Sequence, residues 1–111
     1  LALNVVILNI RPAKSAKNYE KIWDKFGKGS PLLNISNLQL EGIKKTLLSQ
    51  YDHLTFEIGM RYGNPSIPSA LQSLKDQGCD KIIALPMYPQ YSNTTTLSTL
   101  DEINKTLDTW D

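Results

Sequence analysis

Residues 84–96 read Ala84-Leu85-Pro86-Met87-Tyr88-Pro89-Gln90-Tyr91-Ser92-Asn93-Thr94-Thr95-Thr96. The apolar run at residues 82–85 does not alternate with polar residues, which is typical of a strand covered on both faces of a parallel sheet. Pro86 and Pro89 have no backbone N–H to donate, so the chain must leave the sheet here. A strand followed by a polar loop predicts the strand's carboxyl end in an open α/β sheet, where ligands bind.

A helix is expected directly after this polar loop. Asn93 or Thr94 is the natural N-cap residue, because its side-chain oxygen can accept a hydrogen bond from a free backbone N–H. Apolar residues then recur at helical spacing, at Leu97, Leu100, Ile103 and Leu107. The polar loop is therefore expected to meet the N-terminus of the last helix.

Two further helices are predicted in the first half of the chain. Arg11-Pro12 is expected to break the preceding element, since proline disfavours helical geometry in the residue before it. Ser15 can then cap a helix that continues to about Lys25. Ser36 and Gln39 have the spacing of a capping box, which predicts the start of a second helix.

The second half of the chain alternates strands and helices. Residues 54–61 alternate apolar and polar side chains, which indicates a strand. Ser66 can cap a helix that Gly78 ends, and residues 81–85 form the next strand. The pattern predicts an α/β fold, with a parallel sheet and helices on both faces. Two strands are too few for such a sheet, so at least one strand is missing or residues 5–10 supply it.

Composition narrows the class of protein. The chain has 111 residues, 41% of them hydrophobic and 21% charged, which fits one globular domain. A formal net charge of +1 gives no electrostatic argument for binding nucleic acid. Cys79 is the one cysteine, so this chain can build neither an internal disulfide nor a cysteine-ligated cluster. His53, the one histidine, has no second histidine to share a metal and is expected at the surface.

The N-terminal residues, Leu1–Ile10, are apolar but are interrupted by Asn4 and Asn9. The run is shorter than the roughly 20 residues that a membrane-spanning helix needs. It also lacks the basic start and the small-residue cleavage site of a signal peptide. Two interpretations stay open, namely an element packed into a core and an apolar lip resting on a membrane or a hydrophobic substrate. The absence of an initiator methionine suggests that the chain begins inside a longer protein.

Polar and aromatic residues follow both predicted strands. Arg61 and Tyr62 come after the first strand, and Gln90, Tyr91 and Ser92 come after the second. The carboxyl ends of parallel strands share one edge of a sheet, so these residues can line one cleft. The Arg61 guanidinium is suited to grip a carboxylate through two parallel hydrogen bonds. The alternative is that Arg61 ties down its loop through backbone carbonyl groups.

Four ordered blocks of this sequence resemble the ferrochelatase family, whose members insert ferrous iron into a porphyrin. The blocks are Arg11-Pro12-Ala13-Lys14-Ser15 with Tyr19-Glu20-Lys21-Ile22-Trp23, Gly29-Ser30-Pro31-Leu32, Met60-Arg61-Tyr62-Gly63-Asn64-Pro65-Ser66-Ile67, and Tyr88-Pro89-Gln90-Tyr91-Ser92 with the threonines that follow. The resemblance implies that the chain is an interior piece of the N-terminal half of such an enzyme. It implies a flavodoxin-like chelatase half-domain, incomplete over residues 1–111.

The resemblance also implies which side chains contact the porphyrin. In the family, these are the positions that match Arg11, Tyr19 and Ser30. A porphyrin is a flat apolar disc with carboxylates on one side, so it calls for apolar walls with an arginine and a hydroxyl at the carboxylate edge. Arg61, Gln90, Tyr91 and Ser92 are expected to shape the rim of the same cleft.

The resemblance implies that the catalytic histidine and glutamate lie beyond Asp111. The chain is then expected to carry no cofactor and no metal ligand, and to be inactive alone, with ferrous iron as a substrate of the whole enzyme. The expected partners are the porphyrin, the iron and the remainder of the enzyme, in the cytoplasm and with peripheral membrane contact. Two alternatives stay open: a tetrapyrrole carrier without catalysis, and a flavodoxin-like domain that binds another planar ligand.

Overall fold

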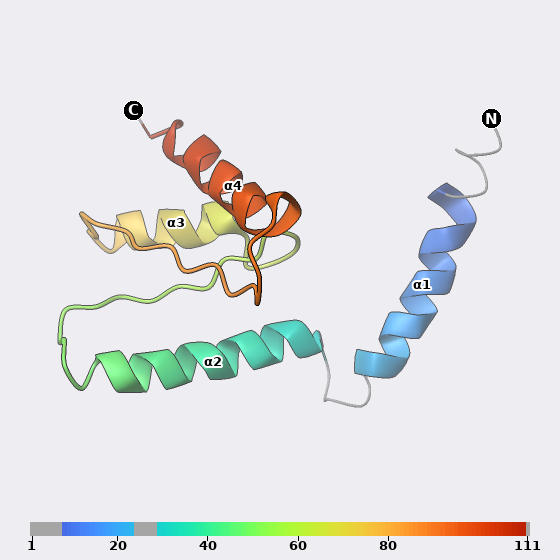
Figure 1. Cartoon of the computed structure of the whole chain (residues 1–111), viewed down its shortest axis with the longest axis horizontal. Coiled ribbons are helices and arrows are strands. Elements are labelled where there is room, and N and C mark those ends of the chain that lie inside the picture. The colour runs from blue at the N-terminus through green and yellow to red at the C-terminus, as the bar shows by residue number, and fades with distance from the viewer. Residues whose placement is uncertain (1–7, 24–28, 111) are drawn as a thin grey trace. The chain divides into compact units, whose positions relative to one another are not determined.

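The computed structural model describes residues 8–23 and 29–110. In chain order, its elements are the helices α1 (Leu8–Trp23), α2 (Pro31–Leu47) and α3 (Ile67–Asp76), the π-helix η3 (Asn93–Leu97), and the helix α4 (Ser98–Leu107) (Figure 1). The chain divides into two compact units, residues 1–39 and residues 40–111. None of the described helices has the length and apolar character needed to cross a membrane.

Helix α1 begins before Pro12 and passes through it, so the predicted break at Arg11-Pro12 is wrong. Pro12 lies one turn inside the helix. Its missing N–H therefore removes only the hydrogen bond that would reach the carbonyl of Leu8. Residues 8–10, considered above as part of a strand, are helical, and residues 5–7 lie outside the described ranges.

Helix α2 begins directly after Ser30, well before the capping box that the sequence suggested. Pro31 occupies the first helical position, where a missing N–H costs no intrahelical hydrogen bond. The Ser30 hydroxyl lies 3.5 Å from the backbone N–H of Leu33, the geometry of a weak N-cap. The predicted start at Ser36 is therefore wrong, because the Ser-Pro pair supplies an earlier one.

Helix α3 confirms the prediction made from its ends. The Ser66 hydroxyl caps the helix by accepting the backbone N–H of Ser69 at 3.2 Å. After the helix, Gly78 adopts a φ of 77°, a left-handed conformation that glycine takes without the clash of a Cβ. The inward face is apolar, and its buried residues are Ile67, Ala70 and Leu71.

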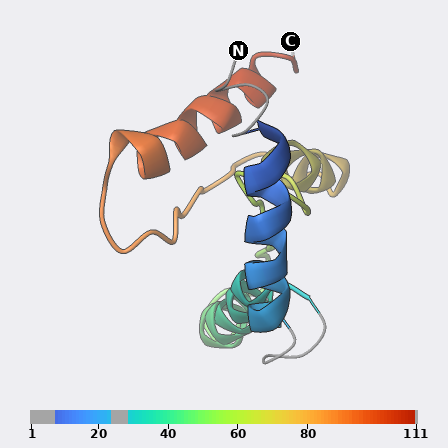
Figure 2. The same ribbon diagram turned by 90° about the vertical axis from the view of Figure 1, so that its right-hand side faces the viewer.

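The predicted parallel sheet is not formed within residues 8–23 and 29–110. The two expected strands, residues 54–61 and 81–85, run without a strand ladder (Figure 2). The pairing near them is one isolated parallel bridge between Met60 and Ser66. The backbone hydrogen bonds of a strand are made with a neighbouring strand. In the described part of the chain, no strand pairs with these two segments. Ile83 is accordingly 82% exposed.

The core of the second unit lies between α3, α4 and the segment that precedes α3. Helices α3 and α4 pack together. Gly59 lies against α3 so closely that an added Cβ would stand 3.1 Å from the Cα of Ile67 and 3.5 Å from the Cβ of Ala70. The nearest obstacle is backbone, which cannot turn aside as a flexible side chain can. Only glycine therefore fits this contact without displacement.

We predict that Gly59→Ala destabilises the chain by about 1–3 kcal/mol, the usual cost of overpacking a well-packed core. Gly42→Ala is the matched control, because Gly42 lies in helix α2 and its Cβ would meet no atom within 4 Å. There, alanine should stabilise the helix by up to about 1 kcal/mol. Urea unfolding followed by circular dichroism measures both changes. Equal effects from the two substitutions would contradict the close packing at Gly59.

Candidate functional site

The loop at residues 61–65 follows the first predicted strand and is closed at its base. The Met60 backbone N–H donates to the carbonyl of Pro65 at 2.8 Å, and Met60 also bridges to Ser66. Within the loop, Gly63 has a φ of 101°, which favours glycine. The loop therefore has a defined base from which Arg61 and Tyr62 project.

Arg61 reaches from this loop to helix α4. Its Nε–H is shared between the carbonyl oxygen of Ser98, at 3.0 Å, and the Ser98 hydroxyl, at 2.9 Å. Its Nη1 lies 3.4 Å from a carboxylate oxygen of Glu102. The guanidinium carbon also lies 4.9 Å from the ring centroid of Tyr62, within the range of a cation–π contact. The side chain thus joins two segments that lie far apart in the sequence.

The second rim segment leads into α4 through the π-helix η3. Its N-cap residue is Ser92, so the prediction of Asn93 or Thr94 as the cap is wrong. The Ser92 carbonyl accepts backbone hydrogen bonds from Thr95 and Leu97, both at 3.3 Å. The five-residue spacing of the second bond is that of a π-helix, which is rare and occurs often at functional sites.

Hydroxyl groups gather at the start of η3. The Ser92 hydroxyl lies 2.6 Å from that of Thr95 and 3.2 Å from that of Thr94. Ser92 caps the helix through its backbone carbonyl and hydrogen-bonds with its side chain to its neighbours, whereas the preceding residues Gln90 and Tyr91 are exposed. The rim therefore offers a solvent-exposed amide and a solvent-exposed phenol beside a serine whose hydroxyl is hydrogen-bonded to its neighbours.

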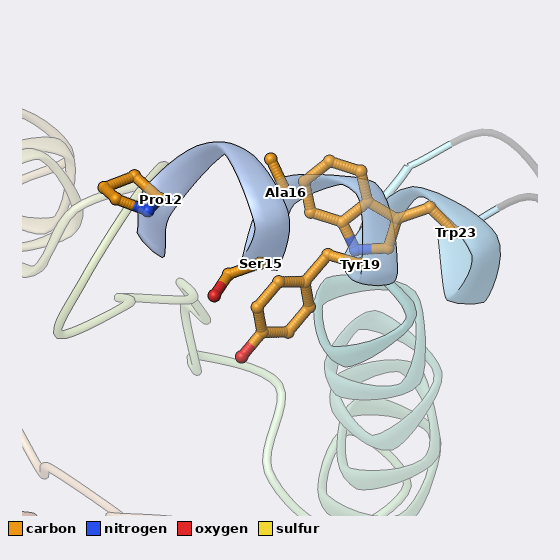
Figure 3. Close-up of a pocket in the computed structure, with 5 residues that line it drawn as sticks. All are labelled: Pro12, Ser15, Ala16, Tyr19 and Trp23. Carbon is orange, nitrogen blue, oxygen red and sulfur yellow. The ribbon is translucent and has the colours of Figure 1, made fainter. Parts of the chain in front are cut away.

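The first unit carries the other predicted site residues. Arg11 lies in α1, and its side chain lies outside the described part of the chain. Tyr19 is 58% exposed on the same helix, and Ser30 caps α2 as described above. An open pocket of about 430 Å³ lies along α1. Figure 3 shows the residues that line it, with the rings of Tyr19 and Trp23 side by side on the helix. Its lining residues are Pro12, Ser15, Ala16, Tyr19 and Trp23.

The spacing of this lining explains the pocket. The residues recur three and four positions apart, so they share one side of the helix. Tyr19 and Trp23 pair there, with ring centroids 6.5 Å apart. An exposed aromatic pair beside a serine hydroxyl is suited to the face of a planar apolar ligand.

The described residues hold no cluster of three or more metal-ligating side chains. His53 confirms its predicted surface position, since its side chain is 93% exposed and lies 3.0 Å from the carboxylate of Asp52. A pair this open to solvent contributes little to stability.

Two residues that contact Arg61 were not predicted as part of the site. Ser98 and Glu102 lie one helical turn apart on α4, a spacing visible in the sequence. Nothing local connects them to an arginine far earlier in the chain, so the sequence contained no signal for this contact.

The profile described as Ferrochelatase matches residues 1–111. The chain belongs to the ferrochelatase family. This confirms the resemblance inferred from the four sequence blocks.

The chain is similar to proteins named ferrochelatase from several organisms. The chain is 50% identical over 111 residues to the ferrochelatase of Hydrogenovibrio crunogenus, covering 99% of this chain and 29% of that protein. It is 51% identical over 102 residues to the ferrochelatase of Alcanivorax borkumensis, covering 91% of this chain and 29% of the relative. Ferrochelatase 2 of Shewanella oneidensis is 43% identical over 110 residues, covering 99% of this chain and 33% of the relative. The chain thus spans about 30% of the length of these relatives, and no solved structure matches it.

We predict that Ser92→Ala loosens η3, because it removes the short hydroxyl contact with Thr95. The loss of one hydrogen bond is worth about 0.5–1.5 kcal/mol, which corresponds to about two- to tenfold faster amide exchange at Thr95 and Leu97. Hydrogen exchange followed by NMR measures it. Ser49→Ala is the control, since the Ser49 hydroxyl makes one exposed bond to the Thr46 carbonyl and the exchange of η3 should not change. Unaltered exchange in Ser92→Ala would contradict the role of the hydroxyl cluster.

Proposed function

We propose that this chain forms part of the porphyrin cleft of a ferrochelatase, an enzyme that inserts ferrous iron into protoporphyrin IX or coproporphyrin III in haem biosynthesis. The family match over residues 1–111 is the observation that carries the proposal. The identities of 43–51% to proteins named ferrochelatase agree with it. The coverage of about 30% of those relatives supports the idea that the chain supplies one part of the enzyme.

The proposed cleft has two sets of residues. Arg11, Tyr19 and Ser30 orient the macrocycle, with the arginine and the hydroxyl at its carboxylate edge. The exposed pair of Tyr19 and Trp23 supports this assignment, because its apolar area suits the flat face of a porphyrin. The second set shapes the rim and consists of Arg61, Gln90, Tyr91 and Ser92.

The reaction requires more than this chain provides. Pyrrole nitrogens must lose protons before iron can bind, so a base must accept them. We propose that the base and the iron-delivering ligands are the family's histidine and glutamate, supplied outside residues 1–111. Distortion of the macrocycle would expose the nitrogen lone pairs to ferrous iron, and residues that grip its edge would hold that geometry. The described residues would then serve to bind and orient the porphyrin.

We further propose that residues 1–111 belong to the N-terminal α/β domain of the enzyme, a flavodoxin-like half with a parallel sheet. Residues 54–61 and 81–85 would become strands once other strands of the enzyme lie beside them. The high exposure of Ile83 and Leu85, at 82% and 67%, supports this, since apolar side chains on a strand are normally covered.

For location, we propose the cytoplasm with peripheral membrane contact. The exposed apolar side chains of Tyr19, Ile22 and Trp23 on α1 support a surface that rests on something apolar. A lipid surface and the porphyrin face share this chemistry. Sedimentation of the full-length protein with phosphatidylglycerol vesicles, with and without porphyrin, distinguishes them.

We predict that Arg11→Ala weakens porphyrin binding by about 1–3 kcal/mol, the range for a lost hydrogen bond to a charged group. Absorbance and fluorescence quenching during titration with protoporphyrin IX measure the affinity. Lys17→Ala is the matched control, because Lys17 is an exposed cation on the same helix. An equal loss in both variants would argue for a general charge effect rather than a carboxylate contact at Arg11.

We also predict that the purified 111-residue chain inserts no iron, because it lacks the proposed base and metal ligands. Formation of the metallated porphyrin, followed by its absorbance spectrum, tests this beside the full-length protein. Steady iron insertion by the chain alone would overturn the proposal that the base and the metal ligands lie outside residues 1–111. Porphyrin binding without insertion by the full-length protein would instead favour a tetrapyrrole carrier.

A further inference from the structure

The side chain of Arg61 is bound along its length by the protein itself. Its Nε–H lies within hydrogen-bond distance of both oxygens of Ser98, and Nη1 faces Glu102 at 3.4 Å. Ring contact with Tyr62 covers the guanidinium on one side. These partners define the direction of the guanidinium without any ligand.

The ion pair with Glu102 lies in a partly shielded place. The side chains of Arg61 and Glu102 are only 27% and 25% exposed. Charges that are shielded in this way interact more strongly than a fully solvated pair, and either one is costly to leave without the other. Glu102 also neutralises the charge that a porphyrin carboxylate would otherwise meet at Arg61. The geometry therefore disfavours Arg61 as the main grip on that carboxylate.

The contacts of Arg61 lie where the rim segment becomes α4. Ser98 is the first residue of α4 and directly follows η3. The other end of η3 is closed by the Ser92 carbonyl, which directly follows Gln90 and Tyr91 in the chain. The contacts of Arg61 with Ser98 therefore hold one end of η3 in place, and the other end of η3 leads directly to the rim residues Gln90 and Tyr91.

We propose that Arg61 is a positioning residue and that Glu102 is the counter-ion that keeps it in place. Together they hold the loop at residues 61–65 against the start of α4, and so set the placement of Gln90 and Tyr91. This inference rests on the proposed ferrochelatase function, because it assigns the two residues a task in that cleft. A misplaced rim lowers the rate at which a bound substrate reacts, even where its affinity is kept.

The test compares steady-state iron insertion by the full-length protein and by four variants: Glu102→Gln, Arg61→Lys, Arg61→Met and the double variant Arg61→Lys/Glu102→Gln. Glu102→Gln should lower kcat about tenfold and change KM for the porphyrin by less than about twofold. Lysine keeps the positive charge but has no Nε–H to share between the two oxygens of Ser98. The kcat of Arg61→Lys should therefore be lowered as much as that of Arg61→Met. The double variant Arg61→Lys/Glu102→Gln should be no worse than Arg61→Lys, since both substitutions break one unit.

A control separates this pair from ion pairs in general. Glu41→Gln breaks the exposed contact between Glu41 and Lys44, which are 3.0 Å apart on helix α2, and should leave kcat and KM unchanged. A direct grip of Arg61 on the porphyrin carboxylate would give a different pattern. Arg61→Lys would then keep most of the affinity, and Glu102→Gln would lower KM by removing a competing charge. That pattern would overturn the proposal.

Hydrogen exchange gives a second readout that does not depend on the reaction. In Glu102→Gln, amide exchange in residues 93–98 should speed up, and the exchange of α2 should not change. If the full-length wild-type protein inserts no iron but exchange accelerates as expected, the proposed function is wrong and the positioning role of Arg61 and Glu102 is supported. If iron is inserted and neither exchange nor kcat responds to Glu102→Gln, the positioning role of Arg61 and Glu102 is wrong and the proposed function is kept.

Discussion

The backbone at Gly59 lies against helix α3 with no room for a side chain, and this close contact holds the chain beside α3 just before the loop at residues 61–65. The backbone at Gly59 meets the backbone of Ile67 at the start of α3, and the chain forms the bridge between Met60 and Ser66 immediately afterwards. Glu57 adds to the same attachment by accepting hydrogen bonds from Ser73, at 2.7 Å, and Gln77, at 3.1 Å. The loop at residues 61–65 is thereby held at its base beside α3.

From this base, the polar contacts extend to α4. Arg61 joins the loop to the first turn of α4, and Lys75 near the end of α3 lies 4.5 Å from the ring centroid of Trp110, just after α4. One cationic side chain therefore joins the loop before α3 to the start of α4, and another joins the end of α3 to a residue just after α4. The buried residues of the described part of the chain, Ile67, Ala70 and Leu71, all belong to α3. The proposed rim, Gln90 to Ser92, enters this arrangement through η3. Its position depends on packing that begins at Gly59.

The sequence predicted elements well where their signals are local. Helix α3 has a serine cap, a proline in its first turn and a glycine after its last, and it forms where these predict. The starts of α1 and α2 were missed because stop and start signals compete: Pro12 is tolerated one turn inside a helix, and Ser30-Pro31 begins a helix before Ser36 can. The expected strands depend on partners that the described part of the chain does not contain.

The sequence by itself determined the family, because four ordered blocks of residues carry it and the profile over residues 1–111 agrees. It also determined which residue types stand at the ends of the two extended segments. Only the tertiary structure decided what Arg61 touches. The contact with Ser98 and Glu102 joins residues 37 or more positions apart, and no helical or strand periodicity relates positions at that separation. It exists because Gly59 and α3 bring the loop to α4, a consequence of packing rather than of local propensity.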